Sequence, residues 1–160
     1  MGRDMREGMP RHAIDKIKTN RYNVLMDILI DASALMPVLI DEPEKRHIIR
    51  LTRNCNLLAP SMLPHEIGNA LTRLKKRHIL SNKEVIMAFS DFKKVPLRLL
   101  DTNIENALLI ACKYSIYAYD AYYFELATRL NLPLLTLDGP MKKVAMDLKL
   151  RIVEEQNEDI

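Results

Sequence analysis

Four acidic residues that are far apart in the chain could act together in one site. Asp31 ends the apolar run LMDILI, and Asp138 ends the apolar run LPLLTL. Glu66 and Asp120 each fall in the first turn of a segment in which apolar residues have helical spacing. The carboxyl ends of parallel strands and the N-termini of the helices that follow them share one edge of a sheet. We therefore expect the four carboxylates to converge at that edge.

Such a group of carboxylates favours a divalent cation. Like charges a few ångströms apart repel each other, and burial increases the repulsion. A site of oxygen ligands without His or Cys suits Mg²⁺ or Mn²⁺, ions that orient phosphate oxygens and activate water. Each acid also has an ordinary interpretation, because a single carboxylate can cap a helix or, like Asp138 before Gly-Pro, form a turn.

The elements that would position these acids alternate along the chain. The predicted strands are residues 25–30, 56–63, 95–101 and 132–138, with a last edge strand at 151–156. The predicted helices are 33–40, a segment from about 43, then 64–80, 82–95, 101–115, 119–131 and 139–150. Ser81 and Glu84 form a capping-box pattern before the fourth of these helices. Short apolar strands separated by helices indicate βαβ units and a parallel sheet.

Composition indicates one globular domain. The 160 residues are 48% hydrophobic, and no apolar stretch reaches the ~18 residues of a membrane span. Residues 1–24 hold six Lys/Arg and three acids and lack a signal-peptide pattern, so we expect a flexible basic leader on a cytoplasmic protein. Residues 25–155 form the domain, and 156–160 form an acidic tail. Cys55 and Cys112 have no metal or disulfide spacing, which predicts ordinary buried thiols.

Four sequence blocks, in this order, resemble the PIN domains, most closely the VapC-type toxins of prokaryotic toxin–antitoxin pairs. The blocks are LIDASAL, PHEIGNAL, YAYDAYYFELA and LPLLTLD, within a resemblance that runs from about Met26 to Glu154. Each block alone is weak, whereas the ordered set is specific. The resemblance implies an α/β fold with three layers, α/β/α, around a central, mainly parallel sheet.

The resemblance also implies a site and an activity. The acidic quartet of the family falls on four residues that would be both catalytic and metal-binding: Asp31, Glu66, Asp120 and Asp138. Ser33 and Thr136 resemble the hydroxyl residues that orient the acids, and Asn69 would support Glu66. The implied function is Mg²⁺- or Mn²⁺-dependent endonucleolytic cleavage of RNA by a homodimer that a small antitoxin protein inhibits. The leader departs from the family pattern, and its role stays open.

Other functions remain as alternatives. The quartet fits equally a PIN-type nuclease of RNA maturation or decay. A catalytically silent PIN fold used for binding is less favoured, because all four acids are present. An aspartyl-phosphate enzyme is disfavoured, because Ala32 and Ser33 follow Asp31 where such phosphatases, by resemblance to their family, carry Asp-x-Asp.

Three further features allow a substrate-binding and a structural interpretation. The run RLKKRH at residues 73–78 is either a set of solvated charges at a helix C-terminus or a patch that binds phosphates. His65 is either a surface residue or a substrate contact. Four tyrosines near Asp120 either pack between helices or stack on RNA bases; they are Tyr117, Tyr119, Tyr122 and Tyr123.

Overall fold

The computed structural model describes residues 25–155, so the predictions for 1–24 and 156–160 lie outside the described residues. One sheet has the strand order β3-β2-β1-β4, and every neighbouring pair is parallel. Its strands are β1 (Met26–Ile30), β2 (Cys55–Pro60), β3 (Leu97–Leu100) and β4 (Leu134–Leu135). The predicted central parallel sheet is therefore confirmed.

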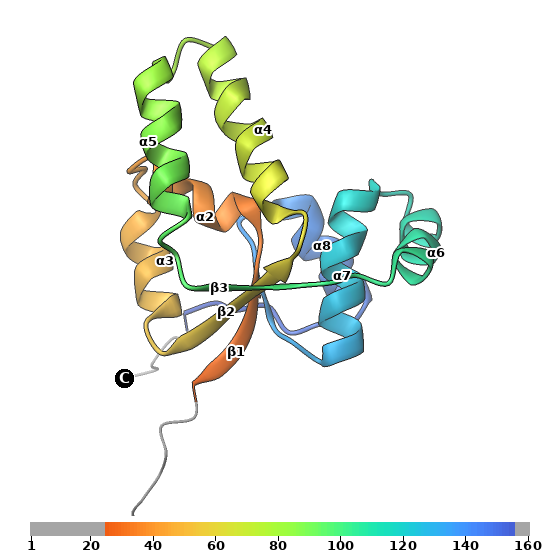
Figure 1. Ribbon diagram of the computed structural model, residues 1–160. Coiled ribbons are helices and arrows are strands. Elements are labelled where there is room, and N and C mark those ends of the chain that lie inside the picture. The colour runs from red at the N-terminus through yellow and green to blue at the C-terminus, as the bar shows by residue number, and fades with distance from the viewer. Residues whose placement is uncertain (1–24, 156–160) are drawn as a thin grey trace, which may run out of the picture.

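Helices enclose this sheet. They are α2 (Ala32–Leu39), α3 (Lys45–Thr52), α4 (Leu63–Lys76), α5 (Asn82–Phe92), α6 (Ile104–Tyr114), α7 (Ala118–Leu130) and α8 (Gly139–Asp147). Helices α3 and α7 contact β2 from opposite sides, which confirms the three-layer α/β/α fold (Figure 1). Helices α4 and α5 extend side by side away from the sheet, and α6 packs on the outside of α7 (Figure 1). None of the helices in residues 25–155 is long and apolar enough to cross a membrane.

Strand β1 lies in the middle of the sheet and leads directly to the predicted site. Ile28, Leu29 and Ile30 are fully buried, as expected for a parallel strand that is covered on both faces. Asp31 follows at once and is the N-cap of α2. The apolar run therefore delivers a carboxylate to the carboxyl edge of the sheet.

The last predicted strand is shorter than the apolar run suggests. Residues 132–138 were expected to be extended, but only Leu134 and Leu135 pair with β1. Beyond them, the amide of Leu137 donates to Ser33 Oγ and the amide of Asp138 donates to Thr136 Oγ1. Side chains of the candidate site thus replace strand pairing. The expected edge strand at 151–156 is a single bridge between Leu134 and Ile152.

Helix α6 presents a different face to the protein than its large apolar residues suggest. Ala107 and Ala111 are buried against α7, whereas Leu108 is 46% exposed and Cys112 is also exposed. The small alanines let the two helices approach closely, and the larger side chains are left outside. The prediction of buried thiols is therefore wrong for Cys112, while Cys55 is partly buried.

A buried carboxylate in α7 connects that helix to the start of α6. Glu125 is 2% exposed and accepts hydrogen bonds from Arg129 Nε at 2.5 Å and from the amide of Asn103 at 3.2 Å. Asn103 is in turn the N-cap of α6 and accepts from the amide of Asn106. Glu125 was not among the residues predicted to matter, although Glu125 and Arg129 have the i, i+4 spacing of a helical ion pair.

Removing the partner of Glu125 should destabilise the fold. Arg129→Met is expected to lower the free energy of unfolding by roughly 2 kcal/mol, because a buried carboxylate loses its counter-charge. The loss is kept below that of a fully buried pair because the Arg129 side chain is 42% exposed. Urea unfolding measures the change. The control Lys94→Met breaks an exposed pair with Asp91 and should cost less than about 0.5 kcal/mol. Equal effects of the two substitutions would contradict this account.

Candidate active site

Asp31 is a buried carboxylate whose two oxygens both accept hydrogen bonds. Its side chain lies at the end of β1 and is 3% exposed. Oδ1 accepts from Ser33 Oγ at 2.7 Å and from the amide of Ala34 at 3.1 Å. Oδ2 accepts from Thr136 Oγ1 at 2.6 Å. These donors offset the cost of burying a charge, and they fix the orientation of the carboxylate.

The two hydroxyls join segments that are distant in sequence. Ser33 Oγ accepts from the amide of Leu137 at 2.9 Å, and Thr136 Oγ1 accepts from the amide of Asp138 at 3.1 Å. Each hydroxyl therefore donates to Asp31 and is itself held by the backbone between β4 and α8. The two hydroxyls thus fix the orientation of the Asp31 carboxylate, and their role toward the other acids stays a prediction.

Glu66 has a partner that the sequence analysis did not assign. It lies in the first turn of α4, and its Oε2 accepts from the hydroxyl of Tyr123 at 2.8 Å. Tyr123 is 1% exposed, and its burial, followed by the charge of Glu66, raises the pKa of the phenol well above its usual value. The phenol therefore stays protonated and donates. The available signal was spacing, because Tyr123 follows Asp120 by three residues and shares its face of α7.

The remaining predicted residues differ in their surroundings. Asp120 lies half-buried in the first turn of α7. Asp138 is exposed and is the N-cap of α8, where its Oδ1 accepts from the amide of Met141 at 2.8 Å. Asn69 is exposed on α4, and within residues 25–155 no hydrogen bond joins it to Glu66. No hydrogen bond in the described residues therefore supports the predicted role of Asn69 beside Glu66.

The acids lie within electrostatic reach of one another. The pKa of Asp31 is raised to about 6 by burial and, to a smaller extent, by the charge of Asp138, against the lowering effect of the hydrogen bonds that it accepts. Burial raises the pKa of Glu66 to about 7, with added contributions from the charges of Asp31 and Asp120. The pKa of Asp120 is raised by burial and then by the charge of Asp138. Negative charge is therefore concentrated at this edge of the sheet.

The carboxylate oxygens of the four acids are the type of ligand that a hard cation prefers, but they are not arranged around a metal site. Within residues 25–155, no group of three or more His, Cys, Asp or Glu side chains could hold a metal ion as arranged. Tyr123 holds one oxygen of Glu66, and the start of α8 holds one oxygen of Asp138. The other oxygen of each, and both oxygens of Asp120, accept no hydrogen bond from the described part of the chain. Oxygen ligands of this kind suit Mg²⁺ or Mn²⁺.

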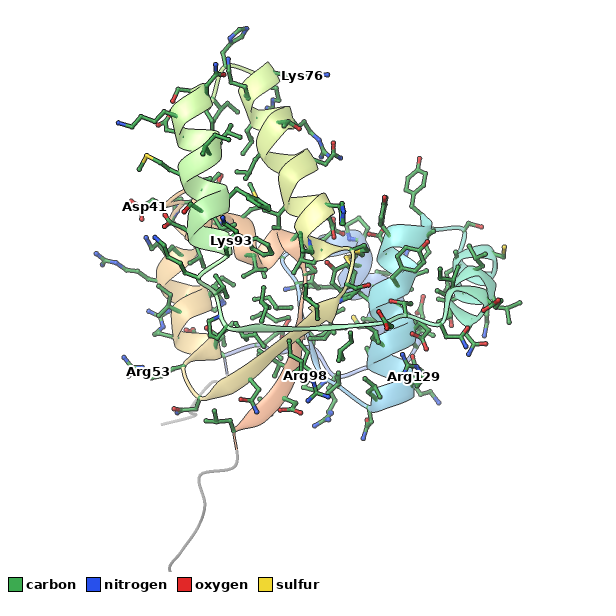
Figure 2. All side chains as sticks on the ribbon, viewed as in Figure 1. Asp41, Arg53, Lys76, Lys93, Arg98 and Arg129 are labelled. Carbon is green, nitrogen blue, oxygen red and sulfur yellow. The ribbon has the colours of Figure 1, made fainter. Side chains whose placement is uncertain are left out.

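The exposure of the side chains helps to choose between the structural and the substrate-binding interpretations of the tyrosines, His65 and the basic run at 73–78. Tyr117 and Tyr119 are 84% and 57% exposed, so most of their surface does not pack between helices. His65 is exposed as well. The basic residues lie at the end of α4. The charge of Arg73 lowers the pKa of Glu66, so Arg73 is close enough to interact with the acids. Lys76 lies at the far end of that helix (Figure 2).

Sequence comparisons give one family. The family model of the PIN domain matches residues 28–146. Ribonuclease VapC12 of Mycobacterium tuberculosis is 26% identical over 114 residues, which cover 70% of this chain and 87% of that protein. Ribonuclease VapC3 of Pyrobaculum aerophilum is 25% identical over 118 residues, which cover 71% of this chain and 90% of that protein.

Solved structures share the fold. PAE2754 from Pyrobaculum aerophilum matches with a TM-score of 0.58 and 21% identity, over 75% of this chain and 80% of the other. Mycobacterium tuberculosis VapC20, described as a sarcin-ricin loop cleaving toxin, matches with a TM-score of 0.55 and 13% identity, over 72% and 93%. VapBC2 from Rickettsia felis, bound to a DNA fragment from the promoter, matches with a TM-score of 0.54 and 14% identity, over 79% and 97%.

Proposed function

The chain belongs to the PIN domain family, and from this premise we propose that it is a metal-dependent endoribonuclease, the toxin of a cytoplasmic toxin–antitoxin pair. The observation that carries the proposal is the buried carboxylate of Asp31, held by two hydroxyls at the edge of the sheet where the other three acids also lie. The names of the curated relatives, which are ribonucleases, support the choice of RNA as substrate.

The four acids divide into two proposed roles. Asp31, Asp120 and Asp138 would be direct ligands of Mg²⁺ or Mn²⁺. When bound, the cation supplies positive charge to the phosphodiester and makes water a better nucleophile at neutral pH. The pKa of about 7 suits Glu66 to exchange a proton with water at neutral pH, either as a ligand or as a proton acceptor. Tyr123 keeps one oxygen of Glu66 in place, so the other oxygen is left for the reaction.

Cleavage of structured RNA by the purified protein tests the proposal. Cleavage is expected with Mg²⁺ or Mn²⁺ and should stop when EDTA is added. The products should result from breaks inside the RNA chain rather than from stepwise removal of single nucleotides at one end. Cleavage that continues in EDTA would contradict a metal-dependent reaction.

The partners are part of the same proposal. A small antitoxin protein would bind and inhibit the enzyme, which itself would be a homodimer. The similarity to the VapBC2 structure supports a protein partner. Induced expression is expected to arrest growth, and co-expression of a small protein encoded next to this chain should restore it. Normal growth during expression of an active nuclease would favour the alternative role in RNA maturation or decay.

A further inference from the structure

A cavity next to the candidate active site is a candidate recognition site for one RNA base. It has a volume of about 330 Å³ and lies between the end of α6, the first turns of α7, and α8. Asp120 lines this cavity and also belongs to the acidic quartet. A ligand in the cavity would therefore lie beside the reacting phosphate.

The walls of the cavity are suited to a flat, apolar ring face. Ile116, Phe124, Pro140, Met141 and Val144 line it. Phe124 is fully buried and Met141 is 5% exposed, so both belong to the fixed core of the protein. Small-molecule sites are typically concave and mostly apolar, with a few polar groups that set the orientation of the ligand. Bases of single-stranded RNA turn outward and enter such sites.

Besides Asp120 and Tyr114, two polar side chains of the cavity place a donor beside an acceptor. Lys143 and Asp147 follow each other by one helical turn on α8, so their side chains are neighbours on one face. Both are exposed, and within residues 25–155 no hydrogen bond or ion pair engages either side chain. The ammonium group can only donate, and the carboxylate can only accept.

Together these features select one base. Resting on the proposed function, we propose that the cavity binds a guanine next to the scissile phosphate, with Lys143 donating to O6 and Asp147 accepting from N1–H and N2–H. Guanine presents an acceptor and two adjacent donors along a single edge, whereas the other RNA bases do not offer two adjacent ring-edge donors to one carboxylate. A charged bidentate contact of this kind discriminates between bases by roughly 5- to 150-fold in affinity.

Inosine is the probe that tests the contact, because it differs from guanosine only in lacking the N2 amino group. Binding of fluorescent single-stranded RNA is measured by anisotropy in EDTA, so the result does not depend on cleavage. Two oligonucleotides are compared that differ by one guanosine or inosine. The wild type is expected to bind the guanosine RNA roughly tenfold more tightly. Asp147→Asn should bring the ratio close to one, whereas Asp101→Asn, at an exposed aspartate outside the cavity, should leave it unchanged.

The outcomes separate this inference from the proposed function. Equal binding of both RNAs by the wild type, or an unchanged ratio in Asp147→Asn, overturns the guanine site whether or not RNA is cut. Base discrimination that depends on Asp147, in a protein that cuts no RNA with Mg²⁺ or Mn²⁺, supports the guanine site and contradicts the nuclease. Mapping of cleavage positions should place a guanine beside the cut in the wild type and lose this preference in Asp147→Asn.

Discussion

Asp120→Asn is expected to lower the rate of RNA cleavage by roughly 100-fold or more while the protein stays folded. Asp120 is half-buried and accepts no hydrogen bond from the described residues, so the amide replaces the carboxylate without breaking a structural contact. On the proposed mechanism, the substitution removes a negative oxygen ligand of the cation. Initial rates with Mg²⁺ and Mn²⁺ measure the effect, and circular dichroism with thermal unfolding verifies the fold.

The matched control is the same chemical change at Asp101. That residue is also an aspartate and is exposed between β3 and α6, outside the acidic quartet. Asp101→Asn should cleave RNA within about twofold of the wild-type rate, as expected for a surface substitution. Full activity of a folded Asp120→Asn variant would remove Asp120 from the site. It would also leave contaminating ribonuclease as the source of any cleavage.

Glu66→Gln is expected to stabilise the metal-free protein at pH 8 and to lower cleavage. Burial raises the pKa of Glu66 from 4.5 to about 7, so the folded protein holds a proton that the unfolded chain has released. Wild-type stability therefore falls as pH rises through this range, and the neutral amide escapes the loss. The gain above pH 7 should be about 1 to 3 kcal/mol, reduced from the full pKa shift by partial exposure.

The dependence on pH and on metal identifies the cause of this gain. Near pH 4, Glu66 is mostly protonated in both the folded and the unfolded state, so Glu66→Gln and the wild type should have similar stability. The new side-chain amide in Glu66→Gln can still accept from Tyr123, because it keeps a carbonyl oxygen. Mg²⁺ or Mn²⁺ should raise the stability of the wild type at pH 8 more than that of the variant. Equal stability at pH 8 in EDTA would show that Glu66 carries no unfavourable charge.

The position of the acids could be predicted from the sequence because it follows from local patterns. The apolar run before Asp31 predicts a buried strand and places the carboxylate directly after the end of that strand. Ser81 and Glu84 form the predicted capping box, with hydrogen bonds in both directions. In each case the determining contacts are a few residues apart. A parallel arrangement of the strands then brings the carboxyl ends to one edge.

What could not be predicted depends on contacts between distant segments. Tyr123 was grouped with the neighbouring tyrosines, but its role follows from the approach of α7 to α4. The predicted helix at 101–115 is confirmed as α6, yet its large apolar residues Ile104 and Leu108 are about half exposed, because the alanines of this helix meet α7. The structural role of Glu125 similarly depends on a distant segment, because the amide that donates to it belongs to Asn103, just before α6. A periodic pattern identifies the element, but the packing partner selects the buried face.

The central claim is that the quartet forms one site for a divalent cation, and Mn²⁺ binding tests it most directly. Free Mn²⁺ is measured by electron paramagnetic resonance during titration of the metal-free protein at pH 8, for the wild type, Asp120→Asn and the control Asp101→Asn. We expect saturable binding to the wild type and to the control, and an affinity at least about tenfold lower for Asp120→Asn. Absence of bound Mn²⁺ in the wild type, or equal binding to all three proteins, would contradict the assignment of the four acids to a metal site.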